Sequence, residues 1–272
     1  MDRIGQSQFA LGGDTRGRGV AALDCVAMWL ESNNTLEPAQ KGAVRMTEYV
    51  VEFGKDGRPL EPDGRLDAAA FHRNQQAIRD VLGRLLRGTT GDVLEAGSGT
   101  GQHVIAFARQ HPEIVWWPSD LHPRHLLSMA AWRAYAGLGN VRPPLRVDLS
   151  DPVWCAEMTD GRGPGPLAAV FCANVVHIAP WPVAGGLFAG SARYLRPDGR
   201  LILYGPFKRD GRHTADSNAV FDTSLRSANA EWGVRDVSEL EQLATGLGLV
   251  LRETVEMPAN NLILCFSRSG ES

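Results

Sequence analysis

The stretch Val93-Leu94-Glu95-Ala96-Gly97-Ser98-Gly99-Thr100-Gly101-Gln102-His103 indicates the fold class of this chain. Its apolar start predicts a short buried strand, and its alternating glycines predict a sharp turn in which the backbone can approach a ligand closely. A phosphate-binding loop of the P-loop type needs a Lys after its last glycine, and none follows here. A dinucleotide-binding loop needs a glycine where this chain has Gln102. Both kinds of phosphate site are therefore disfavoured.

An acid precedes the glycines. Glu95 stands at the end of the predicted strand, where a carboxylate would repel a pyrophosphate but could pair with a cation. S-adenosylmethionine is a cationic ligand of this kind, because it carries a sulfonium and an amino group and no phosphate. The alternative is a glycine-rich turn of an ordinary strand-helix unit with no ligand.

Two more acids end the next two predicted strands. Asp120 follows the strand predicted at 114–119, at the distance from the glycine loop where an acid meets ribose hydroxyls in doubly wound folds. Asp148 ends a strand predicted at 144–148, and we expect it to accept a hydrogen bond from the adenine amine. Either acid alone could instead cap a helix. Three acids after three successive strands indicate a site for a nucleoside with a cationic group.

Composition limits the partners and the compartment. The 272 residues carry a net charge of −3, which gives no electrostatic basis for binding nucleic acid or an anionic membrane. The four cysteines lack C-x-x-C spacing and the seven histidines are not grouped with carboxylates, so we expect reduced thiols, no metal site and a cytoplasmic location. The first twenty residues have no apolar core of a signal peptide. The uncharged stretch 163–192 is interrupted by prolines and glycines, which disfavours a membrane helix.

The chain divides into an N-terminal extension at 1–65 and a domain at 66–272. The extension has a helical apolar spacing at 20–30 and a predicted strand at 49–53. In the domain, strands and helices alternate, which predicts an α/β doubly wound sheet of seven strands with helices on both faces and a closing antiparallel hairpin. The predicted strands are 92–96, 114–119, 144–148, 167–173, 200–204, 249–256 and 262–267. The predicted helices include 101–110, 123–136 and 182–195, with further helical segments between 216 and 247.

From about Phe71 to the C-terminus, the chain resembles the class I, Rossmann-like S-adenosylmethionine-dependent methyltransferases. Within them it resembles the family called domain of unknown function 938. The resemblance rests on the glycine loop with its acid and on blocks that include Trp117-Pro118-Ser119-Asp120, Asn174-Val175-Val176-His177-Ile178-Ala179-Pro180-Trp181, Tyr204-Gly205-Pro206-Phe207 and Trp232-Gly233-Val234-Arg235-Asp236. It implies the methyltransferase fold and S-adenosylmethionine as cofactor, and it leaves the substrate open.

The resemblance also implies residue roles on the cofactor side. The glycine loop would run under the methionine part of the cofactor, with Glu95 orienting nearby amides or the ammonium group. Arg73 and Asn74 would clamp the cofactor carboxylate, or else belong to a solvated helix face. The cofactor-binding set that we predict is Arg73, Asn74, Glu95, Gly97, Ser98, Gly99, Gly101, His103, Asp120, Asp148 and Asn174.

On the acceptor side we predict Asn174, His177 and Tyr204 as catalytic residues. His177 would be a general base, because the ordinary pKa of histidine lies near neutrality. The alternative is a histidine that is hydrogen-bonded within its loop. Tyr204 ends the predicted fifth strand and would face the substrate.

Three functions stay open at this point. The first is methyl transfer to N, O or S of a small molecule. The second is a cyclase, in which the amino group of S-adenosylmethionine attacks its own γ-carbon and methylthioadenosine leaves. The third is a protein that binds S-adenosylmethionine without turnover. The extension at 1–65 would be a lid over the site or an arm that forms a homodimer.

Overall fold

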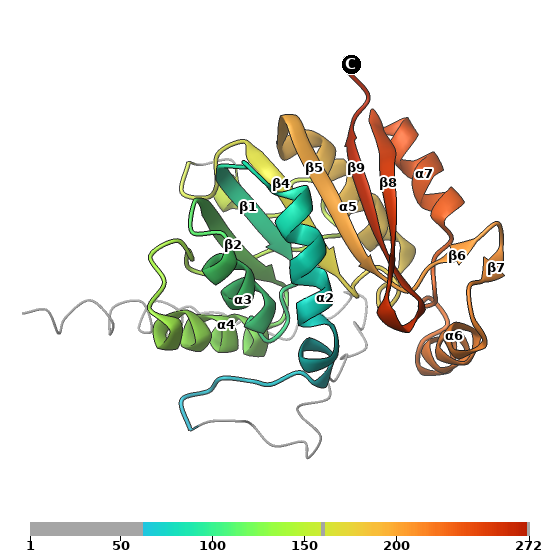
Figure 1. Ribbon diagram of the computed structural model, residues 1–272, viewed down its shortest axis with the longest axis horizontal. Coiled ribbons are helices and arrows are strands. Elements are labelled where there is room, and N and C mark those ends of the chain that lie inside the picture. The colour runs from blue at the N-terminus through green and yellow to red at the C-terminus, as the bar shows by residue number, and fades with distance from the viewer. Residues whose placement is uncertain (1–61, 159–160, 271–272) are drawn as a thin grey trace, which may run out of the picture. The chain divides into compact units, whose positions relative to one another are not determined.

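The computed structural model describes residues 62–158 and 161–270, and these fold around a seven-stranded sheet with strand order β3-β2-β1-β4-β5-β9-β8 (Figure 1). The predicted fold class is confirmed. The helix expected at 20–30 and the strand expected at 49–53 lie outside the described residues, so the division at residue 65 stays a prediction. The strands are β1 Gly91–Ala96, β2 Ile114–Asp120, β3 Leu145–Arg146, β4 Leu167–Ala173, β5 Leu195–Gly205, β8 Leu249–Met257 and β9 Asn261–Arg268.

Helices cover both faces of the sheet (Figure 1). Helices α2, α3 and α4 lie on one face, and α5 and α7 lie on the other. Between β5 and α7, the short strands β6 and β7 form a separate two-stranded sheet beside α6. The helices are α2 Ala69–Leu85, α3 Gln102–Gln110, α4 Pro123–Ala136, α5 Trp181–Tyr194, α6 Asp216–Ala228 and α7 Val237–Gly246, and the short strands are β6 Lys208–Arg209 and β7 Arg212–His213.

Strand direction places the candidate site. Strand β1 pairs in parallel with β2 on one side and with β4 on the other. The strand order therefore changes direction between β1 and β4, which makes this a topological switch point. Ligands of doubly wound sheets bind outside the carboxyl ends of the strands at such a point. Strand β9 runs antiparallel to both of its neighbours and closes the sheet with β8. The carboxyl ends of β1, β2, β4 and β5 therefore meet at one edge.

Two apolar cores hold the sheet, one on each face. Trp116 packs with Ile78 and Phe107 under α2 and α3, whereas Trp117 packs with Leu187 and the other residues under α5 and α7. Neighbouring residues of a strand point to opposite faces, as expected for these two tryptophans. Both are buried, with 0% and 9% of their surface exposed, so both belong to the core.

Local sequence explains where α4 begins and ends. Its N-cap residue His122 accepts a hydrogen bond from the Arg124 amide, Pro123 is the first helical residue, and Gly137 ends the helix with a φ of 62°. The third strand is shorter than predicted, because pairing with β2 covers only Leu145 and Arg146. Pro143 and Pro144 precede it, and proline cannot donate a hydrogen bond to a neighbouring strand.

The uncharged stretch 163–192 folds into β4 and most of α5. All but the last residue of β4 are buried, as expected for an inner parallel strand. Among the described residues, no helix is long and apolar enough to cross a membrane.

Candidate functional site

The glycine loop after β1 needs its glycines for both conformation and space. Gly97, Gly99 and Gly101 have φ angles of 70°, 56° and 86°, a region that favours glycine. A Cβ at Gly97 would lie 2.5 Å from a methyl group of Val175, and one at Gly101 would lie 2.8 Å from Met129. A Cβ at Gly99 would meet no atom of the described residues within 4 Å. The loop therefore packs closely at its two ends and is open at its middle.

Two serines join this loop to β2. The Ser98 amide donates to the Ser119 carbonyl at 2.7 Å, and the Ser119 amide donates to the Ser98 hydroxyl oxygen at 3.0 Å. Both hydroxyls donate to the Glu95 carbonyl. The Ser98 side chain, which we expected at the cofactor, is thus engaged in holding the loop.

Glu95 is a carboxylic acid with an unsatisfied oxygen. Its side chain is 2% exposed overall, and its Oε2 has no hydrogen-bond partner within the described structure. Burial raises the pKa of Glu95 to about 8, hydrogen bonding to Ser98 opposes that shift, and the nearby charge of Asp120 adds to it. A buried, unpaired acid at this place is suited to receive a positively charged group.

Asp120, at the end of β2, is surrounded by hydrogen-bond donors. Its two oxygens accept from the amides of Gly99 at 3.0 Å and His122 at 2.9 Å, and the His125 Nδ1 lies 3.1 Å from Oδ2. Burial acts to raise the pKa of Asp120, but His125 and the two amides outweigh it and hold this pKa below its ordinary value. Asp120 is therefore ionised and fixed beside the glycine loop.

Asp148 lies just past the short strand β3. Its Oδ1 accepts from the Ser150 amide at 2.9 Å and the Ser150 hydroxyl at 2.6 Å, which is a turn stabilised by an aspartate side chain. The side chain is half-buried at the same strand edge as Asp120. The turn accounts for one carboxylate oxygen and leaves the predicted adenine contact as a prediction.

Four polar side chains connect α2 to the strand ends. His103 Nε2 lies 2.9 Å from the Asn74 Oδ1, and Asn261 donates to the Tyr204 hydroxyl at 3.0 Å. Asn74 also hydrogen-bonds to Tyr204. Burial lowers the pKa of His103 to about 4, so its ring is neutral and donates to Asn74.

This group separates residues that the sequence analysis had paired. Asn74 is buried inside it, whereas its neighbour Arg73 is exposed. Tyr204 is only 4% exposed and belongs to the core under α2. The predicted carboxylate clamp and the predicted substrate contact of Tyr204 stay untested by this arrangement.

The loop after β4, residues 174–180, carries Asn174 and His177. Asn174 adopts a φ of 58° and its amide donates to the Tyr204 carbonyl at 2.8 Å. His177 is 1% exposed and its ring contacts Phe221 edge to face, with 5.9 Å between centroids. Its Nδ1 has no partner among the described residues. A Cβ at Gly205 would lie 2.7 Å from the imidazole, so the ring fits over this glycine.

The electrostatics of His177 correct one expectation. Burial, and then the positive charge of Arg235, lower the pKa of His177 to about 3. The reason given for a general base, a pKa near neutrality, is therefore wrong for this conformation. His177 is a neutral imidazole whose free nitrogen can take part in a hydrogen bond.

Sequence reasoning missed a second group that fixes the glycine loop. The Gln102 Oε1 accepts from the Ala68 amide at 2.8 Å, and its Nε2 donates to Asp67 at 2.6 Å. The Ser128 hydroxyl accepts from the Leu66 amide and donates to the Thr100 carbonyl. These contacts join residues 66–68 to the loop. The sequence signal for these contacts is Gln102, a polar residue where a dinucleotide-binding loop has its last glycine. From the sequence alone, it is interpreted only as evidence against a dinucleotide-binding loop.

Taken together, this strand edge fits S-adenosylmethionine. Within the described residues, it offers a buried acid with one unpaired oxygen at Glu95, a fixed ionised acid at Asp120 and a backbone cradle whose middle glycine is open. A site for a pyrophosphate would instead need positive charge or free amides near the glycines.

Comparisons with known proteins agree on the fold. A family model described as protein of unknown function (DUF938) matches residues 65–268. The mitomycin 7-O-methyltransferase MmcR is similar in structure, with a TM-score of 0.56 and 18% identity over 67% of this chain and 50% of that chain. CalO1, a methyltransferase in calicheamicin biosynthesis in its SAH-bound form, has a TM-score of 0.53 and 17% identity over 74% and 57%.

An O-methyltransferase family 2 protein from Planctomyces limnophilus, in complex with apigenin, has a TM-score of 0.58 and 18% identity over 72% of this chain and 57% of that chain. This chain thus spans 50–57% of the length of these three structures. At such identities the likeness shows the fold, which is that of the class I methyltransferases.

Proposed function

Because the chain belongs to the DUF938 family and has the class I methyltransferase fold, we propose that it is an S-adenosylmethionine-dependent methyltransferase that acts on N, O or S of a small molecule. The observation that carries the proposal is Glu95, a fully buried acid with one oxygen unpaired in the described structure, directly before an open glycine loop. A buried unpaired acid is costly unless a ligand completes it. A cationic cofactor would do so.

Different residues at the strand edge would contact different parts of the cofactor. Glu95 would take the positively charged methionine end beside the glycine loop, and Asp120 would accept from the ribose hydroxyls. Asp148 would contact the adenine through the oxygen that its turn leaves available. Arg73, which is exposed beside Asn74, would reach the cofactor carboxylate.

On the acceptor side, this chain supplies a neutral and largely apolar wall. When bound, S-adenosylmethionine supplies a methyl group attached to a positively charged sulfur. The buried imidazole of His177 packs edge to face against Phe221, and because it is neutral it would add no positive charge near the sulfonium. His177 would orient the acceptor by a hydrogen bond, and Asn174 would hold the cofactor ammonium. Positioning of this kind is worth on the order of 7–11 kcal/mol at best.

A small-molecule acceptor is supported by the absence of a net positive charge in the sequence and by the relatives' names. The three similar structures are a mitomycin methyltransferase, a calicheamicin-pathway methyltransferase and a protein bound to apigenin. None of these names favours the cyclase, and the proposed lid lies outside the described residues. We therefore do not propose the cyclase further.

The test is mass spectrometry of the purified full chain incubated with S-adenosylmethionine, with and without a pool of small-molecule acceptors. We expect S-adenosylhomocysteine together with a methylated product that appears only when acceptors are present. Methylthioadenosine formed from S-adenosylmethionine alone would contradict methyl transfer. Asp120→Asn should lower product formation, and boiled protein is the blank.

A further inference from the structure

Residues 206–236, between β5 and α7, form a unit that we call the cap. It contains β6, β7 and α6 (Figure 1). Its apolar residues Leu225, Trp232 and Val234 form a cluster of their own, separate from the two cores of the sheet. Ile178, from the loop 174–180, packs against this cluster. The loop that carries Asn174 and His177 thus shares its packing with the cap.

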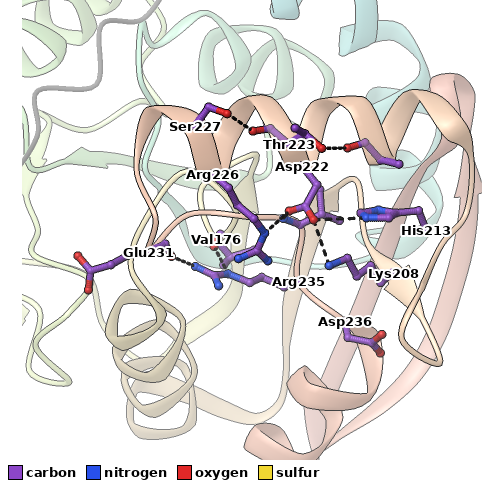
Figure 2. Close-up of polar contacts among 12 residues, drawn as sticks. Val176, Lys208, His213, Asp222, Thr223, Arg226, Ser227, Glu231, Arg235 and Asp236 are labelled. Atoms are coloured by element: carbon purple, nitrogen blue, oxygen red, sulfur yellow. Dashed lines mark hydrogen bonds and ion pairs between the residues drawn. The ribbon is translucent and has the colours of Figure 1, made fainter.

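Arg235 joins the cap to this loop. Its guanidinium donates to the carbonyls of Val176 at 2.9 Å and Glu231 at 2.8 Å (Figure 2). It also donates to the Ala179 carbonyl at 2.6 Å. The neighbouring Gly233 amide donates to the His177 carbonyl at 2.9 Å. Three hydrogen bonds therefore run from residues 233 and 235 to the backbone around His177. Each bond from the guanidinium is charge-assisted and is stronger than one between neutral groups.

Asp222 fixes the segment on which Arg235 lies. Its Oδ1 accepts from the Val234 amide at 2.7 Å, and Lys208 and Arg226 each approach a carboxylate oxygen to 3.2 Å (Figure 2). The His213 Nε2 lies 3.3 Å from the Asp222 Oδ2, the same oxygen that Lys208 approaches. The Asp222 side chain is only 9% exposed. One buried carboxylate thus links α6, the β6–β7 hairpin and residue 234.

We propose that Arg235 is a positioning residue for methyl transfer, which holds the loop 174–180 and with it His177 and Asn174 against the cap, while Asp222 holds the segment of Arg235 in place. The role in methyl transfer rests on the proposed function. The attachment of the loop to the cap stands on the contacts alone. The charge of Arg235 has a second effect, because it helps burial to keep His177 neutral.

Hydrogen exchange of the full chain, followed by mass spectrometry, tests the attachment. In Arg235→Gln, we expect backbone amides of residues 175–180 and 229–236 to exchange about tenfold faster, because charge-assisted hydrogen bonds are lost. Arg235→Lys should restore part of the protection. Asp222→Asn is expected to speed exchange at 229–236 through loss of the carboxylate charge.

Arg268→Gln is the matched control. Arg268 also donates through Nε and Nη2 to backbone carbonyls, those of Ala192 and Leu195, at the opposite end of β5. Its loss should speed exchange near 192–195 and leave 175–180 unchanged. Unchanged exchange at 175–180 in a folded Arg235→Gln protein would overturn the proposal.

The His177 ring provides a readout that a purely structural role would not change. In protein labelled with carbon-13 at histidine Cε1, the signal lost in His177→Gln identifies this ring. We expect its shift to stay constant between about pH 5 and pH 8 in the wild type, Arg235→Lys and Arg268→Gln. In Arg235→Gln we expect the shift to move with pH, because release of the loop exposes the buried ring to water and the nearby positive charge is also lost. A constant shift in Arg235→Gln as well would contradict control of His177 by Arg235.

Affinity for S-adenosylmethionine separates this proposal from the proposed function. Arg235→Gln should weaken this binding by at most about threefold, since Arg235 reaches the cofactor only through Asn174, whose amide keeps its hydrogen bond to the Tyr204 carbonyl. A loss as large as that in Asp120→Asn would place Arg235 itself on the cofactor side and overturn the positioning role. If the wild type itself fails to bind, the proposed function fails, and the exchange and ring measurements still decide the attachment.

Discussion

The amide of Gly99 donates a 3.0 Å hydrogen bond to the carboxylate of Asp120, so the glycine loop after β1 is bonded to the acid that ends β2. The same carboxylate accepts from the His122 amide at the start of α4. The two halves of the proposed cofactor site, for the methionine part and for the ribose, are therefore built as one unit. A substitution in either half is therefore expected to alter the geometry of the other.

The first prediction concerns Asp120. Asp120→Asn should weaken binding of S-adenosylmethionine by about 1–3 kcal/mol, because the ionised acceptor of the ribose hydroxyls is lost. Isothermal titration calorimetry measures this change. Asp92→Asn is the control, since Asp92 accepts hydrogen bonds from Trp117 and Gly165 at the other end of these strands. Equal affinity in Asp120→Asn and the wild type would refute the ribose role.

The second prediction concerns the close contact of the glycine loop with the loop after β4. Gly97→Ala adds a Cβ that would lie 2.5 Å from Val175, in a backbone conformation with a φ of 70°. We expect about 2–4 kcal/mol of lost stability, from the strain of roughly 1–2 kcal/mol and from overpacking. Thermal and urea unfolding measure it. Gly137→Ala, with a φ of 62° and no described residue within 4 Å of the added Cβ, should show the strain alone. Equal losses in the two variants would contradict the contact.

The third prediction concerns the pH dependence of stability through Glu95. The folded protein holds the Glu95 proton up to about pH 8, whereas the unfolded chain releases it near the ordinary value of 4.5. Between these two pH values the folded state binds more protons, so the contribution of Glu95 to stability falls as pH rises, by at most about 1.4 kcal/mol per pH unit.

Unfolding of Glu95→Gln between pH 5 and about pH 8 tests this sign. The variant should gain stability relative to the wild type as the pH is raised, and the gain should level off above the folded pKa. Glu241→Gln, at an exposed position on α7, should show no such trend. A gain that shrinks with rising pH would contradict the raised pKa of Glu95.

The fourth prediction concerns proton release on binding. If Glu95 is protonated in the free protein and ionised beside a cationic cofactor, binding at about pH 7 releases a proton. Calorimetry in buffers with different ionisation enthalpies should show this release in the wild type and its absence in Glu95→Gln. Equal proton release in both proteins would assign it to another group, such as the cofactor amine.

The fifth prediction concerns the packing of the His177 ring against Gly205. Gly205→Ala would place a Cβ 2.7 Å from the imidazole Cε1, and we expect a loss of about 1–3 kcal/mol in stability as the ring is displaced. Gly185→Ala lies in α5, where the added Cβ would meet none of the residues that the structure describes within 4 Å, and it should be neutral or stabilising by about 0.5–1 kcal/mol. Melting temperatures of the two variants make the comparison. A neutral Gly205→Ala would show that the ring is free to move.

Several parts of this fold follow directly from local sequence. Helix α4 lies at 123–136 as predicted, because Pro123 and Gly137 mark its ends. The β6–β7 hairpin was missed, because its strands are Lys208–Arg209 and Arg212–His213 and show no apolar alternation. The third strand was predicted too long at 144–148, because the apolar pattern does not show that Pro143 and Pro144 cannot donate hydrogen bonds to β2.

The candidate site shows the same limit. Spacing along the chain was enough to bring Glu95, the glycine loop and Asp120 to one strand edge, where the structure has them. The pKa of His177 was not accessible in this way. It is set first by burial and then by the charge of Arg235. Arg235 and Phe221, whose ring contacts the imidazole, both lie more than forty positions away in the sequence. Periodicity and spacing do not predict how segments that are distant in the sequence bury a side chain.

The most direct test of the central claim is a calorimetric titration of the full chain with S-adenosylmethionine, run beside a titration with NAD. We predict that S-adenosylmethionine binds one site per chain, that Asp120→Asn weakens this binding, and that NAD gives no heat. Binding of NAD in preference, or no binding of S-adenosylmethionine to folded protein, would contradict the account.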